Sequence, residues 1–207
     1  MKKALLLVDL QHDFCLNGAL AVPDGDEVIH VANQAIHVFH QRGWPIIATL
    51  DWHPANHKSF AVNSGGQIGE SGLLNGLPQI WWPVHCVQNT HGASLHEKLE
   101  QQQITTLIYK GQNSETDSYS AFFDNDKRAS TQLHDWLTEQ NIRQLVIMGL
   151  ATDYCVKFTV LDGLELGYQV EVLAAGCRGV NLQPTDSEQA LTDMMEQGAK
   201  IIQLQQL

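Results

Sequence analysis

The sequence has few basic residues and no long apolar run. Its 12 lysines and arginines stand against 23 aspartates and glutamates, so the formal net charge is −11 at pH 7. This charge would repel phosphates and anionic lipid headgroups, which makes nucleic acid and membrane surfaces poor candidate partners. No stretch approaches the roughly 20 apolar residues that span a bilayer. The first apolar run stops at Asp9, too soon for a signal peptide.

Cysteine is also scarce. The four cysteines lie far apart and form no CxxC pair: Cys15, Cys86, Cys155 and Cys177. This spacing favours neither a disulfide scaffold nor a zinc ribbon, and we expect a cytoplasmic, reducing location. The 207 residues contain no linker-like stretch, so we expect one domain over residues 1–207.

Apolar residues gather instead in short continuous runs. Such runs predict strands that are buried on both faces, as in a parallel sheet covered by helices. Six runs are expected to be strands: residues 4–8, 45–50, 105–109, 144–150, 169–174 and 199–204.

Between these runs, apolar residues recur at helical spacing. The first helix is expected around Val28 to Phe39 and to end at Gly43. Further helices are expected over residues 93–102, 127–140, 154–166 and 187–197. The alternation predicts a single-domain, doubly wound α/β sandwich whose six-stranded, mainly parallel sheet has helices on both faces.

One region breaks this rhythm. Residues 51–90 carry Trp, His, Pro, Gly and Asn with little periodicity, and connections this long are usually functional or disordered. Ligands of an open parallel sheet bind beyond the carboxyl ends of its strands. In this sequence those ends carry reactive side chains: Asp9, Asp51, His53, Lys110 and Cys155.

Cys155 is the candidate nucleophile. It follows a polar, glycine-containing turn near the start of a helix, where the helix dipole would lower the pKa of the thiol and free N–H groups could bind an oxyanion. An isolated cysteine is more often buried and structural, and the other three cysteines keep that interpretation.

Asp9 and Lys110 are the candidate partners of Cys155. Asp9 could take the thiol proton and later deliver it to a leaving group, although an aspartate at a strand end is often only a cap. Lys110 could hold Asp9 ionised and favour the thiolate, although a lysine in this position is usually only solvated. Their coincidence at successive strand ends favours the catalytic interpretation.

A metal site is expected from Asp51 and His53. Their spacing on extended chain points both side chains the same way. His85 is the preferred third ligand because it lies in the same irregular region, with His57 and Ser59 as alternatives. Three such ligands leave positions open for water or substrate. The remaining histidines are interpreted as surface residues: His12, His30, His37, His40, His91, His96 and His134.

With these residues, the sequence resembles the nicotinamidases within the isochorismatase-like cysteine hydrolases. The matching segments occur in the family's order along the whole chain: residues 7–14, 51–60, 82–88, 110–111, 119–122 and 149–156. The Asp, Lys and Cys segments alone would indicate the wider superfamily. Asp51, His53 and His85 narrow the resemblance to its metal-containing nicotinamidases.

The resemblance implies a triad of Asp9, Lys110 and Cys155 and the metal ligands Asp51, His53 and His85. It also implies a cis peptide bond between Leu150 and Ala151, an oxyanion hole from the N–H groups of Ala151 and Cys155, and a pyridine ring held between Phe14 and Trp82. The implied metal is divalent, with zinc preferred and manganese or iron as alternatives.

The implied reaction converts nicotinamide to nicotinate and ammonia through a Cys155 thioester, in NAD salvage, and also pyrazinamide to pyrazinoate. A homo-oligomer remains open, and residues 67–79 look like an idiosyncratic loop. Three alternatives are an amidase for carbamoyl or ureido substrates, an isochorismatase, and a redox or metal-binding protein with Cys155 as a sensing thiol. The metal ligands argue against the carbamoyl or ureido amidase, and the cysteine argues against the isochorismatase. Ammonia release would exclude the third.

Overall fold

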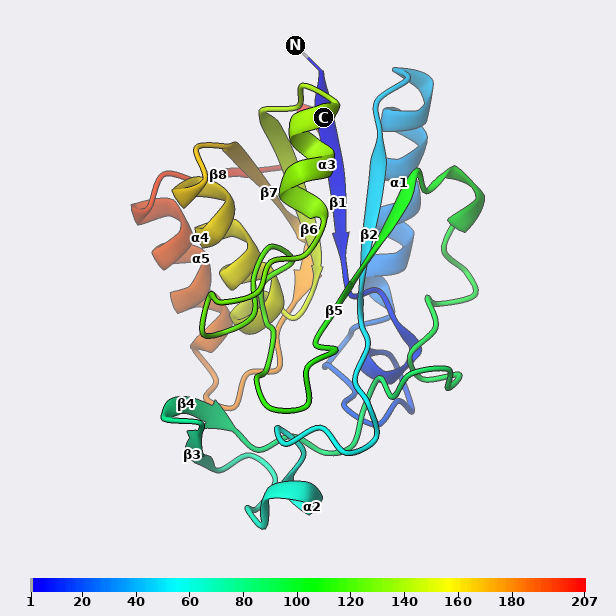
Figure 1. Cartoon of the computed structure of the whole chain (residues 1–207). Coiled ribbons are helices and arrows are strands. Elements are labelled where there is room, and N and C mark those ends of the chain that lie inside the picture. The colour runs from blue at the N-terminus through cyan, green and yellow to red at the C-terminus, as the bar shows by residue number, and fades with distance from the viewer. Residues whose placement is uncertain (1) are drawn as a thin grey trace.

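The computed structural model describes residues 2–207 and is built on one six-stranded parallel sheet (Figure 1). Met1, part of the domain expected over residues 1–207, lies outside the described residues. The strands follow the spatial order β5-β2-β1-β6-β7-β8, which confirms the expected fold class. Their bounds are β1 (Lys3–Val8), β2 (Ile46–Asp51), β5 (Thr106–Lys110), β6 (Gln144–Leu150), β7 (Gln169–Arg178) and β8 (Lys200–Ile202).

The strand order reverses direction at β1. The chain first moves from β1 outward to β2 and β5, and then returns to place β6 on the other side of β1. Leu7 pairs with both Ala48 and Met148 in the parallel register. In an open α/β sheet the crevice at such a reversal is where ligands bind.

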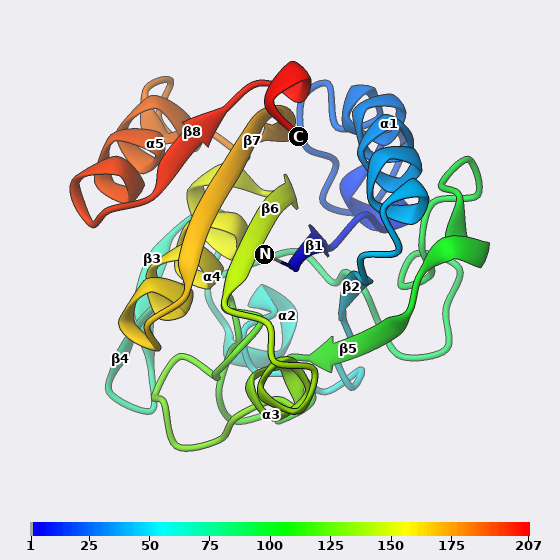
Figure 2. The same cartoon turned by 90° about the horizontal axis from the view of Figure 1, so that it is seen from above.

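Helices cover both faces of the sheet. Figure 2 shows α1 (Glu27–Gln41) on one side and α3 (Leu133–Glu139) and α4 (Lys157–Glu165) on the other. The buried face of α1 carries the predicted apolar stripe, including Val28 and Phe39, and Gly43 follows the helix with a positive φ of 64°. The last helix, α5 (Asp186–Glu196), contacts β8 and α4.

The prediction of a helix over residues 93–102 is wrong. Only the 3-10 turn η2 (Gln101–Gln103) forms there. The backbone of this segment bonds across to the chain after β1 instead: His12 N–H donates to Ser94 O at 3.1 Å, and His96 N–H donates to Leu10 O at 2.9 Å. These long-range bonds occupy groups that a helix would pair within itself.

Other boundaries also differ from the sequence prediction, and β7 continues to Arg178, beyond its expected end at residue 174. The helix expected from residue 127 begins only at Leu133, because the Asp124 carboxylate accepts the Ala129 N–H at 3.1 Å and holds a turn before it. The helix after β6 opens with the π-helical turn η3 (Thr152–Val156) before α4. At the C-terminal end, β8 is shorter than predicted and the 3-10 turn η4 (Leu204–Gln206) follows it.

The irregular region between β2 and β5 contains defined structure. It includes the short helix α2 (Ala61–Ser64) and a hairpin of β3 (Ser71–Leu74) and β4 (Leu77–Ile80). Residues 67–79 are therefore mostly hairpin, not the expected loop. Asn75 and Gly76 both have positive φ, as the two-residue turn of a hairpin requires. The hairpin lies beyond the carboxyl ends of the strands, at the bottom of Figure 1.

No helix within residues 2–207 is long and apolar enough to cross a membrane.

Candidate active site

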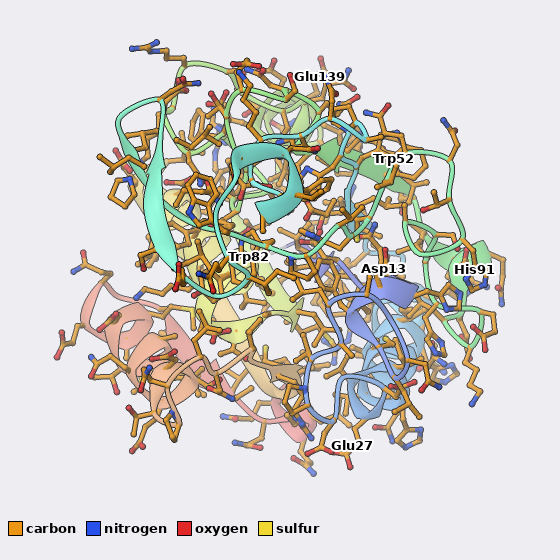
Figure 3. All side chains as sticks on the ribbon, turned by 90° about the horizontal axis from the view of Figure 1, so that it is seen from below. Asp13, Glu27, Trp52, Trp82, His91 and Glu139 are labelled. Atoms are coloured by element: carbon orange, nitrogen blue, oxygen red, sulfur yellow. The ribbon has the colours of Figure 1, made fainter. Side chains whose placement is uncertain are left out.

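The reactive side chains predicted at the strand ends meet at the reversal of the strand order. Asp9 follows β1, Asp51 and Lys110 end the paired strands β2 and β5, and Cys155 lies in η3 after β6. Figure 3 looks onto this end of the molecule, with Trp82 near the middle of the view. All four reactive residues are buried. The parallel register explains the convergence, because the carboxyl ends of neighbouring strands share one edge.

Lys110 is the centre of the cluster. Its Nζ lies 2.9 Å from Asp9 Oδ2 and 3.0 Å from Asp51 Oδ1. The same ammonium donates to Ser118 O at 2.9 Å and approaches the Cys155 sulfur at 3.4 Å. One buried cation therefore contacts two carboxylates and the thiol.

Burial and neighbouring charges shift the pKa values of Lys110 and Asp51 in opposite directions. Burial alone would lower the pKa of Lys110, but Asp51 and Asp9 raise it well above its usual range. Burial would raise the pKa of Asp51, but His53 and Lys110 hold it well below its usual range. Lys110 and Asp51 are therefore charged at neutral pH.

The pKa of Asp9 is raised, unlike that of Asp51. Burial raises its pKa above the ordinary 3.8, with Lys110 opposing the shift. The Thr49 hydroxyl donates to Asp9 Oδ1, which favours the carboxylate. Among residues 2–207, Asp9 Oδ2 receives no hydrogen bond besides its ionic contact with Lys110. Oδ2 is thus an oxygen with a lone pair available for a proton.

The pKa of the Cys155 thiol shifts against the direction expected from the sequence. Burial raises this pKa well above 9.0, and the lowering by Lys110 does not overcome it. The expected lowering by a helix start is therefore outweighed by desolvation. The thiol is protonated at rest, so attack by its sulfur requires a base that accepts the proton.

The chain after β6 has the backbone expected from the resemblance. The peptide bond between Leu150 and Ala151 is cis. Ala151 O accepts the N–H groups of Tyr154 and Val156, at 3.1 and 3.0 Å, which closes the π-helical turn around Cys155.

Asp51, His53 and His85 form a compact set of metal-type donors. Asp51 Oδ2 lies 2.9 Å from His53 Nε2 and 3.3 Å from His85 Nε2. The three donor atoms all lie within 4.8 Å of one another, and all three residues are buried.

The outer nitrogens of both histidines face backbone carbonyls. His53 Nδ1 is 2.8 Å from Gly111 O, and His85 Nδ1 is 2.8 Å from Pro83 O. In the neutral rings Nδ1 therefore carries the proton and Nε2 has the lone pair. Two lone pairs and a carboxylate oxygen that converge in this way are suited to a cation between them, so the residues fit a divalent metal.

Gly111 makes this arrangement sterically possible. It has a positive φ of 67°, and a Cβ there would lie 2.5 Å from His53 Cε1 and 2.9 Å from Asp51 Oδ1. A side chain at this position would displace both donors.

His57 and Ser59, the alternative ligands, lie beside this set. Ser59 N–H donates to His57 Nδ1 at 3.2 Å, so the proton of the neutral ring is on Nε2. Burial lowers the pKa of His57 to about 4, so the ring is neutral at pH 7. With Nε2 protonated, His57 has no lone pair to offer toward His53 and Asp117, although the three residues are close enough to form a second donor group.

Two residues of the donor set, Asp51 and His85, and the Cys155 thiol line one aromatic pocket. Phe14 and Trp82, predicted from the resemblance, both line it, and the Phe14 ring meets His85 edge-on at 5.6 Å. The complete lining is Phe14, Leu20, Asp51, Trp82, His85, Asp117, Tyr119, Ala151, Tyr154, Cys155 and Val180.

Several residues of this site were not predicted from the sequence. Tyr154 packs edge-on against Trp82 at 4.9 Å, and the Tyr119 hydroxyl accepts the Trp82 Nε1–H at 3.2 Å. Gln11 holds the end of β2 that carries Asp51. Its side-chain amide donates to Asp51 O and accepts the Asp51 N–H, each at 2.8 Å. Thr49 has a sequence signal, since it lies two residues before Asp51 and on the same face of the strand.

The parallel α/β fold and the Asp–Lys–Cys cluster define the class as a cysteine hydrolase of the isochorismatase-like type. A family model described as the isochorismatase domain matches residues 3–206. The nicotinamidase of Escherichia coli K12 is 56% identical over 202 residues, which cover 98% of this chain and 95% of that protein. The chain belongs to the isochorismatase family.

Two solved structures are similar over nearly the whole chain. The nicotinamidase/pyrazinamidase of Acinetobacter baumannii superposes with a TM-score of 0.93 at 38% identity, covering 99% of this chain and 97% of the other. The pyrazinamidase of Pyrococcus horikoshii, solved in complex with zinc, gives a TM-score of 0.79 at 37% identity, covering 98% and 99%.

Proposed function

We propose that the protein hydrolyses nicotinamide to nicotinate and ammonia, and pyrazinamide to pyrazinoate, as a step of NAD salvage. The observation that carries this proposal is an aromatic pocket lined both by Cys155 and by the metal donors Asp51 and His85. Lys110 contacts Asp9, Asp51 and Cys155, and His53 completes the donor set. The names of the similar proteins support the same substrates. The domain is the whole chain, residues 1–207.

Asp9 starts the reaction. Its Oδ2 takes the proton of the Cys155 thiol while the sulfur attacks the amide carbon of the substrate. The N–H groups of Ala151 and Cys155 hold the carbonyl oxygen as it becomes negative. Asp9 then gives the proton to the departing nitrogen, so that ammonia leaves and a thioester remains on Cys155.

The same carboxylate completes the cycle. Asp9 removes a proton from a water molecule, which attacks the thioester carbon, and the proton passes to the sulfur as the acid is released. A protonated resting thiol, as its raised pKa requires, makes Asp9 necessary in the first step. Lys110 keeps Asp9 in its carboxylate form and stabilises the sulfur as its proton departs.

Asp51, His53 and His85 would hold one divalent transition metal, and zinc is the ion proposed, on the chemistry of the donors and the zinc complex of the similar pyrazinamidase. When bound, the metal supplies a Lewis-acid position for the ring nitrogen of the substrate. Phe14 and Trp82 would contact the ring and orient its amide toward Cys155.

Ammonia release from nicotinamide tests the proposal. The parent protein should release it and Cys155→Ala should not, whereas Cys177→Ala is a matched control that removes a buried thiol outside the pocket. Benzamide, which has no ring nitrogen, should be a poor substrate. Absence of ammonia from nicotinamide, or equal rates with benzamide, would contradict the substrate assignment.

A further inference from the structure

Asp13 makes two contacts that no step of the proposed reaction uses. It lies in the 3-10 turn η1 (His12–Phe14), at the same end of the molecule as Trp82 in Figure 3. Asp13 Oδ2 accepts the Cys86 N–H at 2.7 Å, and Asp13 Oδ1 accepts the Ala19 N–H at 3.2 Å. One carboxylate therefore ties the chain around Cys86 to η1 and to the loop that follows it.

Cys86 links Asp13 to two of the metal donors. The Cys86 carbonyl accepts the His53 N–H at 3.0 Å, and Cys86 follows His85 directly in the chain. The backbone of this one residue is thus joined to His53 by a hydrogen bond and to His85 by a peptide bond. Because Asp13 holds the Cys86 N–H, its carboxylate acts on both histidines through Cys86.

The backbone of Cys86 has a conformation that needs support. Its φ is 45°, in the left-handed region that residues with a Cβ seldom occupy. Cys86 is fully buried, so its N–H depends on the Asp13 carboxylate for a partner. The angle φ is a rotation about the bond between N and Cα. A change in φ would therefore turn His85 relative to the carbonyl that holds His53.

Gly92 makes room for the Asp13 carboxylate. The Asp13 N–H donates to Gly92 O at 3.0 Å, and a Cβ on Gly92 would lie 2.2 Å from Asp13 Oδ2. The same two segments also pack where His96 stacks on His12, with 5.1 Å between ring centroids. His96 is only 5% exposed, so its interpretation as a surface residue is wrong. The packing of the two segments therefore sets the position of the carboxylate.

We propose that Asp13 is a positioning residue of the metal site, which fixes the spacing of His53 and His85 by holding Cys86. This inference rests on the proposed function and adds a residue to its metal site. Loss of a group that supports a metal ligand commonly lowers metal affinity by about 10- to 100-fold. Asp13 acts through a backbone and not on a donor atom, so its loss should cost about tenfold, the lower end of that range.

Zinc affinity, measured by competition with a chromophoric chelator, tests this role without reference to activity. In Asp13→Asn the amide has one acceptor oxygen for two N–H groups, so zinc affinity should fall about tenfold. Asp153→Asn is the matched control. The Asp153 carboxylate also accepts two backbone N–H groups, those of Val180 at 2.9 Å and Asn181 at 2.7 Å. These contacts lie outside the donor set, so Asp153→Asn should keep the parent zinc affinity.

Gly92→Ala tests the same role without a change of charge. The added Cβ should displace the Asp13 carboxylate and lower zinc affinity as Asp13→Asn does. Because both changes break one contact, Asp13→Asn/Gly92→Ala should bind zinc no more weakly than the weaker of the two single variants. Urea unfolding of the zinc-free proteins measures the accompanying change in stability. If Asp13→Asn fails to fold, Gly92→Ala alone gives the result.

The pattern of zinc affinities decides the proposal. Lower affinity in Asp13→Asn and Gly92→Ala, with the parent affinity in Asp153→Asn, supports the role of Asp13. Parent affinity in Asp13→Asn and Gly92→Ala, or an equal loss in Asp153→Asn, overturns that role and leaves the proposed function intact. A parent protein that binds no zinc overturns the metal site of the proposed function, and the role of Asp13 with it.

Discussion

Replacement of Lys110 by methionine tests the electrostatic centre of the site. Lys110 and Asp9 are both fully buried, and Lys110 lies 2.9 Å from Asp9 and 3.0 Å from Asp51. Methionine has a similar length but no charge, so Lys110→Met leaves the Asp9 carboxylate buried without its cation. Breaking a buried ion pair on one side costs about 3–5 kcal/mol. The free energy of unfolding should fall by this amount, and ammonia release should fall with it.

The pH dependence of this loss has a definite sign. Burial already raises the pKa of Asp9, and Lys110 is the main group that lowers it. Without Lys110 the folded-state pKa of Asp9 rises further above its unfolded value, so the folded protein binds the extra proton. The destabilisation should therefore shrink as the pH is lowered and grow as the pH rises through the folded-state pKa.

Urea unfolding of parent and variant at several pH values measures this effect. Lys157→Met is the matched control, because it removes the ion pair with Asp193 from a partly exposed position and should cost no more than about 1 kcal/mol. Asp9→Asn combined with Lys110→Met should recover part of the lost stability, since the unpaired charge is gone. Equal effects of Lys110→Met and Lys157→Met would refute the reasoning.

Three other changes probe the reaction. Cys155→Ala should abolish turnover and leave the fold intact, as judged by circular dichroism; activity near the parent rate would remove the nucleophile from the proposal. Thr49→Val deletes the hydroxyl that favours the Asp9 carboxylate, so the acid limb of kcat/KM should move to higher pH, and an unmoved limb would show that Asp9 is not the titrating base. Removal of the metal, or His53→Ala, should mainly raise KM for nicotinamide because the contact with the ring nitrogen exists before reaction; an unchanged KM would contradict ring-nitrogen binding.

The sequence predicts the sheet and the convergence at its carboxyl edge well. Continuous apolar runs such as residues 144–150 coincide with buried strands, and parallel strands place their last residues at one edge. Asp9, Asp51, Lys110 and Cys155 follow from that rule, and the structure brings all four together. Their chemical roles remain proposals.

The local sequence pattern does not predict structure that depends on contacts between distant segments. Residues 93–102 have helical spacing, but their backbone pairs with the chain near His12, which no local pattern contains. The raised pKa of Cys155 depends on burial, and the burial of His96 depends on the same packing. Tyr119 and Tyr154 enter the pocket from segments that carry no strand-end signal. The hairpin was predictable in part, since Asn75–Gly76 is a strong turn pair.

The central claim is that Cys155 forms a thioester with the acyl group of nicotinamide. Acid quenching of the protein during turnover, followed by intact-protein and peptide mass spectrometry, tests it directly. We predict a nicotinoyl adduct on the peptide that contains Cys155, which accumulates early, decays when nicotinamide is exhausted and is absent from Cys155→Ala. Rapid nicotinate formation with no adduct on Cys155 at any quench time, or the same adduct in Cys155→Ala, would contradict the account.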